Sequence, residues 1–371
     1  MKKLTDICDI QYGYAFDSKK FTEDNSYPPI VRIRDIKRGF SETYYSGEYP
    51  KQYVLHAGDL LVGMDGEFNI ARWKDADALL NQRVCKLTAK EGTNEEYLRF
   101  AMIKRLKAIE DKTAFVTVKH LSAKELNKLE LNVPSIREQD NVAEVLTKLE
   151  KLILLREEEL KSLDKIIKAR FVELFGNPRS NPFSFDEWRL KDTCKVVTGN
   201  TPSRAVSEYY GNYVEWIKTD NIVSGLLNPT KATECLSEKG MEAGRIVERD
   251  SILMACIAGS IASIGRVCVT DRTVAFNQQI NAVVPEKYNV LFLYVLLQIS
   301  KDYLVEDVNM ALKGILSKSK LEEKKFIVPP IELQNQFADF VNQVNKSKVA
   351  IQKALDKTQM LFDSLMQEYF G

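Results

Sequence analysis

An internal duplication constrains the fold of this chain more than any other feature. The stretch "KLTDICDIQYG" from Lys3 matches "RLKDTCKVVTG" from Arg189. Further on, "NIARW" matches "SIGRV", "LNQRV" matches "FNQQI", and "LNVPSIREQ" matches "FIVPPIELQ", all in the same order. From Gln139 and from Gln334 the two halves align without a gap until both stretches end in Phe-Gly. Each match is weak alone, but the shared order indicates two copies of one unit.

Each copy has a mixed pattern followed by one long helix. Short β-branched runs such as "PPIVRIRDI", "YVEWIKT", "SILMACIA" and "INAVVP" predict strands, whereas "NEEYLRFAMIKRLKAI" and "VLFLYVLLQISKDYL" predict helices. A turn at Pro134, or at Pro329 and Pro330, precedes each long helix, where proline is favoured. We therefore expect an α+β chain with two similar mixed α/β domains and two long helices. The predicted segments are 1–137, 138–177, 178–332 and 333–371.

The two long helices carry imperfect heptad seams, in which apolar side chains recur every seven residues with a companion position between them. The predicted seam residues are Leu146, Leu149, Ile153, Leu160, Leu163, Ile167 and Leu174 in the first helix, and Val341, Val344, Ile351, Leu355, Phe362, Leu365 and Tyr369 in the second. Arg156, Arg170, Lys348 and Thr358 interrupt the seams. Two imperfect seams in one chain most simply pair with each other. An antiparallel pairing would relate the two halves by a pseudo-two-fold axis, and the plain alternative is a helical hairpin without a special role.

Composition narrows the class of protein. Of the 371 residues 44% are hydrophobic and 28% charged, which is typical of a globular protein. The net charge of +1 neither indicates nor excludes a nucleic-acid ligand. The longest apolar run is too short to cross a bilayer, and Asp6 and Asp9 interrupt the segment where an export signal would need apolar residues. The six cysteines are scattered singly, so we expect a cytoplasmic protein with reduced thiols and no zinc site.

The motifs of common enzymes are missing or incomplete. The two histidines, His56 and His120, are not at equivalent positions of the repeat, and no phosphate loop of the G-x-x-x-x-G-K type occurs. "YPPI" and "VPPI" lack the polar residue and the aromatic that an amino-methyltransferase motif needs, and the Glu-x-Lys triplets at 110–112 and 322–324 lack a convincing partner aspartate. We predict no catalytic residue and no metal ligand in this chain.

The stretch "TGNTPSRAVSEYYGNYVEWIKTDNI", residues 198–222, suits a nucleic-acid ligand. Arginine and lysine neutralise phosphates or grip guanine edges, hydroxyls position phosphates, and asparagine and glutamine pair with adenine. The candidate residues in the second half are Thr201, Ser203, Arg204, Tyr209, Trp216, Lys218, Arg266, Asn277, Gln278 and Gln279. Those in the first half are Lys19, Lys20, Arg32, Arg34, Lys37, Arg38, Arg72, Gln82 and Arg83. The alternative is an ordinary Gly-Asn-Thr-Pro turn, with Trp216 and the tyrosines in the core.

These stretches, together with "LSKSKLEEKKFIVPPIELQNQFADFV" and its first-half counterpart "HLSAKELNKLELNVPSIREQDNVAEVL", resemble the specificity subunit of type I restriction–modification systems. The resemblance covers essentially the whole chain. The proline turn followed by Glu138-Gln139 fits the family pattern, while Leu333 replaces the expected glutamate before Gln334. "TPSR" occurs only in the second half, so the two recognition domains have diverged.

The resemblance implies a non-catalytic subunit that recognises double-stranded DNA. Each target-recognition domain would contact one half of a split target, and the antiparallel helices would set the gap between the halves. Two modification subunits, which carry S-adenosylmethionine and the adenine methyltransferase site, would dock on the helices, and ATP-driven restriction subunits would join them. This chain itself would hold no cofactor. A specificity subunit of an atypical or fused restriction enzyme, and a coiled-coil scaffold that binds no DNA, remain the alternatives.

Overall fold

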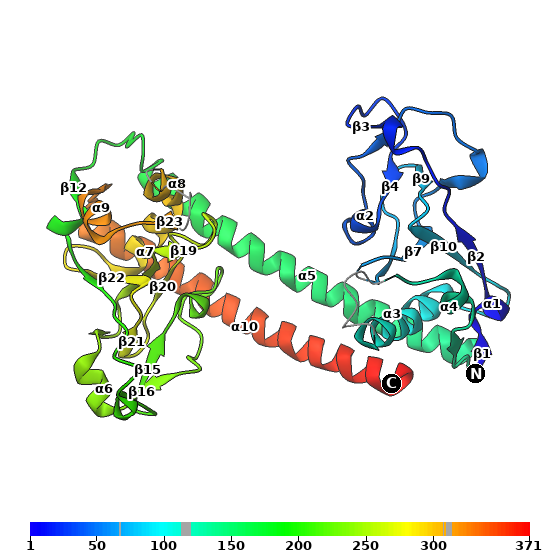
Figure 1. The fold of residues 1–371 in the computed structure, drawn as a ribbon. Coiled ribbons are helices and arrows are strands. Elements are labelled where there is room, and N and C mark those ends of the chain that lie inside the picture. The colour runs from blue at the N-terminus through cyan, green and yellow to red at the C-terminus, as the bar shows by residue number, and fades with distance from the viewer. Residues whose placement is uncertain (67, 113–119, 307, 309–313) are drawn as a thin grey trace. The chain divides into compact units, whose positions relative to one another are not determined.

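The structure is a computed structural model that describes residues 1–66, 68–112, 120–306, 308 and 314–371 (Figure 1). The chain forms two compact units. Unit 1 comprises Met1–Leu155 together with Ala354–Gly371, and unit 2 comprises Arg156–Lys353. Each unit therefore contains one mixed α/β domain and a part of each long helix.

Unit 1 is built on a four-stranded antiparallel sheet. Its strand order is β2 (Cys8–Tyr12), β10 (Val84–Ala89), β7 (Leu60–Gly63) and β8 (Ile70–Arg72). Buried side chains from these strands, among them Leu60, Val62 and Cys85, pack with the helices of the unit into one core. The other face of these strands is also covered, since Leu61 and Val84 belong to a second core with Ile36 and Trp73.

Unit 2 repeats this sheet in the same order. The strands are β13 (Cys194–Thr198), β22 (Ile280–Pro285), β18 (Ile252–Ala255) and β20 (Val267–Val269). All their pairings are antiparallel, as in unit 1. The common order of four strands with intervening crossovers confirms the duplication that the sequence predicted.

A second sheet is also shared by the two units, with three strands in unit 1 and five in unit 2. In each unit a central strand pairs with one neighbour in parallel and with the neighbour on its other side in antiparallel orientation. The strands are β4 (Ile30–Val31), β9 (Ala78–Leu80) and β6 (Val54–Leu55) in unit 1, and β15 (Val214–Ile217), β21 (Val274–Phe276) and β17 (Ile246–Val247) in unit 2.

The remaining elements extend, connect and cover these sheets. In unit 1 they are β1 (Lys2–Lys3), α1 (Leu4–Ile7), η1 (Ser18–Lys20), β3 (Phe21–Thr22), α2 (Ile33–Arg38), β5 (Tyr44–Tyr45), η2 (Lys51–Tyr53), α3 (Glu95–Lys112), α4 (Ala123–Asn127) and β11 (Glu130–Leu131). In unit 2 they are β12 (Glu187–Arg189), η3 (Leu190–Asp192), η4 (Ser207–Tyr209), β14 (Tyr210–Gly211), η5 (Thr219–Asn221), β16 (Cys235–Leu236), α6 (Glu238–Ala243), β19 (Ile257–Ala258), α7 (Val290–Ile299), α8 (Lys301–Val305), β23 (Gly314–Ile315), α9 (Lys318–Glu323) and β24 (Lys325–Ile327).

One predicted strand is mostly a helix. The alternating run "PPIVRIRDI" forms a strand only over β4, and α2 follows immediately. Asp35 accepts a hydrogen bond from the backbone N–H of Arg32 at 2.9 Å and so caps the helix start. Gly39, with φ of 79°, closes the helix end in the left-handed conformation. These local caps outweigh the alternating pattern.

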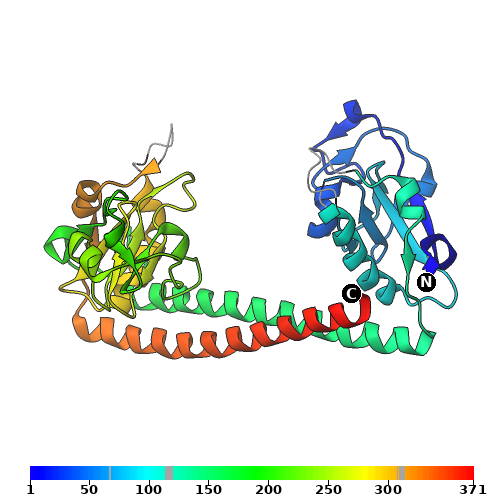
Figure 2. The same ribbon diagram turned by 60° about the horizontal axis from the view of Figure 1, so that its bottom comes forward.

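The two long helices are α5 (Ile136–Phe175) and α10 (Ile331–Phe370), and each begins two residues before the predicted boundary. Within unit 1 the first part of α5 packs against the last part of α10, since Leu146 shares a core with Met366, Phe362 and Leu365. Figure 2 shows the two helices side by side along this stretch. The direction of the pairing is antiparallel, as expected.

Within unit 2 the last part of α5 packs against the first part of α10. Ile167 and Phe171 share a core with Val341 and Phe337, and the Phe171 and Phe337 rings are 5.5 Å apart, edge to face. The pairing is therefore antiparallel here too. The predicted seam did not include these two phenylalanines. Phe171 lies off the repeat and stacks on Phe292 of α7 at 5.5 Å, whereas Phe337 lies seven residues before Val344 and so extends the repeat.

All fourteen predicted seam residues are buried or half-buried. The polar interruptions have specific partners. Lys348 forms an ion pair with Asp164 at 2.7 Å, and Thr358 donates its hydroxyl to the Ala354 carbonyl at 2.8 Å. Arg170 pairs with Glu173 at 2.8 Å on the helix surface. The seams accommodate polar residues because each has an acceptor within reach.

The six cysteines are unpaired, and five of them are buried. Burial raises the pKa of the Cys85 and Cys256 thiols to about 12, so these side chains are protonated packing groups. Among the helices of the described ranges, none combines the length and the apolar character needed to span a membrane.

Candidate nucleic-acid interface

The same glycine contact lies at the same edge of the main sheet in both units. Gly13 follows β2 and donates its N–H to the Val84 carbonyl, and Gly199 follows β13 and donates its N–H to the Ile280 carbonyl, both at 3.0 Å. A Cβ atom at Gly13 would lie 2.0 Å from the Asn81 carbonyl oxygen. Glycine is required here because two backbone segments touch.

The segment touched by each glycine is a turn that we call the Asn-Gln turn, residues 81–83 in unit 1 and 277–279 in unit 2. Asn81 accepts the N–H of Gln82 at 2.9 Å, and Asn277 accepts the N–H of Gln279 at 3.1 Å. Both asparagines are buried. The prediction that Asn277 contacts adenine is therefore corrected, because its side chain is buried and hydrogen-bonded to Gln279 within the turn.

The residues after each asparagine reach the surface. Gln82, Arg83 and Gln278 are exposed, and Gln279 is half-buried. Thr201 donates its hydroxyl to the Gln278 side-chain oxygen, which joins the stretch 198–222, here called the opening segment, to the Asn-Gln turn. The structure thus brings together two stretches that are far apart in the sequence and that both contain predicted DNA-binding residues.

Two cations of the opening segment share one carboxylate. Arg204 and Lys218 contact the two oxygens of Glu234 at 2.7 and 2.9 Å. Hydrogen bonds from Lys218 and Arg204 hold the pKa of Glu234 below its usual value. Arg204 also lies over the Tyr210 ring, 4.4 Å from its centroid. This arrangement holds two positive charges, the exposed Arg204 and the half-buried Lys218, beside one carboxylate.

Trp216 is a core residue and not a surface contact. Its side chain is 3% exposed and packs with Val214, Leu236 and Ala275. Its indole N–H donates to the Asn200 carbonyl at 3.3 Å, so the buried ring supports the backbone at Asn200. The alternative prediction, that Trp216 belongs to the core, is therefore confirmed. Tyr209 is half-buried, while Ser203 is exposed.

In unit 1 several predicted residues line one surface hollow of about 340 Å³, which we call the basic hollow. Its lining residues are Phe16, Ser18, Phe21, Arg32, Ile33, Arg34, Asn81, Gln82 and Arg83. Arg32 and Arg34 come from the start of α2 and Arg83 from the Asn-Gln turn. Three guanidinium groups in one hollow suit phosphate oxygens or guanine edges.

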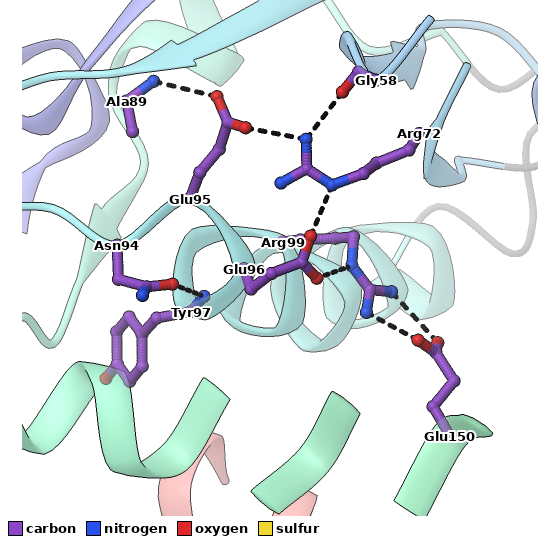
Figure 3. Close-up of polar contacts among 9 residues, drawn as sticks. All are labelled: Gly58, Arg72, Ala89, Asn94, Glu95, Glu96, Tyr97, Arg99 and Glu150. Atoms are coloured by element: carbon purple, nitrogen blue, oxygen red, sulfur yellow. Dashed lines mark hydrogen bonds and ion pairs between the residues drawn. The ribbon is translucent and has the colours of Figure 1, made fainter. Parts of the chain in front are cut away.

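Arg72 does not belong to this surface. Its guanidinium contacts Glu96 and, at 2.8 Å, Glu95, both at the start of α3. Figure 3 shows that the chain of ion pairs continues from Glu96 through Arg99 to Glu150 on α5. Burial would raise the pKa of Glu96, but hydrogen bonds from Arg99 and Arg72 outweigh it and keep that pKa low. The DNA contact predicted for Arg72 is therefore corrected to a structural ion pair.

Arg266, the counterpart of Arg72 in unit 2, is also engaged. It donates to the carbonyls of Thr219 and Ser263 at 3.2 and 3.3 Å, so it supports the turn that follows β15. The predicted residues Lys19, Lys20, Lys37 and Arg38 are exposed. Arg38 forms an ion pair with Glu42 at 2.7 Å and lies over the Phe40 ring. Exposed lysines on short elements suit phosphate contacts.

The two histidines contact carboxylates. His56 lies 2.7 Å from Asp77 at the surface, and His120 hydrogen-bonds Asp65. Asp65 in turn holds Arg83 at 2.6 Å. The sequence did not single out Asp65, because it lies 55 positions from His120 and neither residue belongs to a motif.

Two copies of one sheet, each with an Asn-Gln turn at the same edge and with a different side chain at the third position of that turn, define a duplicated recognition protein. A family model for the type I restriction modification DNA specificity domain matches residues 1–165 and 183–358. The chain belongs to this family, as its motifs predicted.

Individual relatives agree with this membership. The type I restriction enzyme EcoBI specificity subunit of Escherichia coli is 26% identical over 394 residues, which cover 98% of this chain and 83% of that protein. The MjaIX specificity subunit of Methanocaldococcus jannaschii is 24% identical over 321 residues, 77% of this chain and 70% of that protein.

Solved structures show the same fold. The S subunit of a type I restriction-modification system from M. genitalium superposes with a TM-score of 0.63 at 17% identity, covering 100% of this chain and 95% of that one. A second structure, from work on complex assembly and conformational transition of the type I R-M system, has a TM-score of 0.55 at 16% identity, covering 100% and 96%. The α+β class with two mixed domains and antiparallel helices is thus confirmed.

Proposed function

We propose that this chain is the DNA-recognition subunit of a type I restriction–modification complex and that each unit recognises one half of a split target. The observation that supports this most directly is the Asn-Gln turn. Its backbone bond repeats, from Val84 to Asn81 at 2.9 Å and from Ile280 to Asn277 at 3.1 Å, while the third residue of the turn differs, Arg83 in unit 1 and Gln279 in unit 2. A common frame with different polar side chains is what two readers of different half-sites need.

Positioning on DNA would come from exposed cations. The exposed Lys19, Lys20 and Arg204, together with the half-buried Lys218, would contact phosphates, which set the register but do not specify sequence. Gln82, Arg83, Gln278 and Gln279 would contact base edges. The small net charge of +1 is compatible with this division, because the cations are concentrated locally.

The chemistry would belong to partner subunits. We propose that two modification subunits supply S-adenosylmethionine and methylate adenine, and that restriction subunits supply ATP-driven translocation and cleavage, in the cytoplasm. Both long helices carry exposed apolar side chains that suit docking, including Leu154, Ile166 and Val172 on α5 and Val349, Met360 and Leu361 on α10.

Methylome sequencing of a host that expresses this chain with its modification subunit tests the proposal. A new split motif, with two short blocks around a fixed gap and methyladenine in each block, is the expected result. If the complex assembles and no motif appears, a coiled-coil scaffold becomes the better account. Sequencing with the modification subunit alone is the control.

A further inference from the structure

Arg83 and Gln279 extend from the same backbone position in the two units. The Arg83 carbonyl accepts the N–H of Met64 at 3.0 Å, and the Gln279 carbonyl accepts the N–H of Cys256 at 2.8 Å. The next hydrogen bond also repeats, from Leu121 to Met64 at 2.7 Å in unit 1 and from Leu316 to Cys256 at 2.8 Å in unit 2. The two side chains can therefore be compared directly.

Their surroundings differ at two further positions. In unit 1, Asp65 and His120 face each other in a β-bridge, and Asp65 bonds both His120 and Arg83. In unit 2 the matching bridge joins Ile257 and Ile315. Three positions thus change together, from an arginine with a carboxylate and an imidazole to a glutamine with two isoleucines.

The carboxylate orients the arginine without covering it. Asp65 is 17% exposed and holds one guanidinium nitrogen, Nη1, at 2.6 Å, whereas the Arg83 side chain is 51% exposed. Because its fork is held on one side, Arg83 loses less freedom when it binds a planar acceptor pair. Guanine presents such a pair, O6 and N7, in the major groove.

We propose that Arg83, positioned by Asp65, recognises a guanine in the half-site bound by unit 1. This inference rests on the proposed function and adds the identity of one base. At the same position of unit 2, Gln279 presents an amide in place of the guanidinium, and its side-chain oxygen accepts a hydrogen bond from Asn277 at 3.3 Å. Arg83 also lines the basic hollow with Arg32 and Arg34, which leaves room for the edge of a base pair.

The experiment uses the full chain in complex with its modification subunit and compares the methylome motif of the wild type with that of Arg83→Gln. The wild-type motif should contain a guanine whose replacement is tolerated after the substitution. Competition binding with duplexes that vary only at this position should show the preference for guanine falling by about 5- to 150-fold. Asp65→Asn should reduce the same preference and leave the other positions of the motif unchanged.

Arg137→Gln, an exposed arginine at the start of α5, is the matched control and should leave the motif unaltered. Thermal unfolding of each variant separates a binding effect from misfolding. A motif without guanine in the affected half, or an equal loss of affinity for all sequences after Arg83→Gln, would overturn the inference while the proposed function stands. A wild-type complex that binds no particular sequence would overturn both.

Discussion

Gln139 and Gln334 occupy the same position in the two repeats, and each accepts the N–H of an asparagine 45 residues earlier at 2.9 Å. Each also donates to a proline carbonyl in the turn before its own helix, at 2.9 Å to Pro134 and at 2.8 Å to Pro329. The two side chains are 0% and 1% exposed. The glutamine therefore joins the start of a long helix to the start of an earlier helix, α3 in unit 1 and α7 in unit 2.

Replacing Gln139 by alanine should destabilise unit 1, because the half-buried Asn94 N–H and Pro134 carbonyl lose this partner. We expect a loss of about 1–3 kcal/mol in the free energy of unfolding, measured by urea denaturation. Gln343→Ala, at an exposed position of α10, is the control and should change stability by less than about 0.5 kcal/mol. Equal effects of the two substitutions would contradict the role of the buried amide.

The ion-pair chain from Arg72 to Glu150 should make unit 1 sensitive to acid. The pKa of Glu96 is lowered in the folded state relative to its ordinary value of 4.5. Its contribution to stability is therefore complete above that value and is lost as the pH falls through the lower, folded pKa. Glu96→Gln should lower the unfolding temperature at pH 7, and calorimetry at decreasing pH should show the difference from the wild type narrowing. Glu48→Gln, at an exposed site, should show no such trend.

Gly199→Ala should disturb the Asn-Gln turn of unit 2. The added Cβ atom would lie 2.2 Å from the Asn277 carbonyl oxygen and 2.5 Å from that of Phe276, and backbone atoms cannot swing aside. We expect a loss of about 1–3 kcal/mol in stability and weaker binding to the half-site of unit 2. At Gly259 a Cβ atom meets nothing within 4 Å, so Gly259→Ala is the matched control. A folded, fully active Gly199→Ala protein would show that the turn tolerates displacement.

Two substitutions should separate phosphate contacts from base contacts. Lys19→Ala should weaken binding to all sequences alike and reduce the salt dependence of binding. Gln278→Ala should cost on the order of 1–3 kcal/mol at one base pair only. Fluorescence anisotropy with a panel of single-base variants measures both effects. If both proteins lost affinity uniformly, the assigned roles would be wrong.

Alanine at both Arg156 and Arg170 should weaken binding of the modification subunit, as expected for polar seam positions that face a partner. The ion pair of Arg170 with Glu173 is largely exposed, so its loss should change stability by less than about 1 kcal/mol. Interferometry with the purified modification subunit measures the affinity. Unchanged binding would contradict a contact between these arginines and the modification subunit.

The duplication and the helix seams could be predicted from sequence because both are periodic patterns. The fates of Arg72 and Trp216 could not be predicted in the same way. Arg72 is withdrawn from the surface by Glu95 and Glu96, which are more than 20 positions away, and charge alone does not reveal which partner an arginine will find. Gln139 was recognised as part of a family pattern, but its buried hydrogen bonds depend on a fold that brings Asn94 to it. Periodicity predicts which face is buried, whereas polar partners are set by the tertiary arrangement.

The division of the chain into units has a consequence for its synthesis. Unit 2 is one continuous segment, Arg156–Lys353, so it can complete its core while translation continues. Unit 1 needs Phe362, Leu365 and Met366 from the far end of the chain, packed against the start of α5. The mixed domain of unit 1 is synthesised first, but its apolar surface around Leu146 is covered only after this part of α10 has been synthesised.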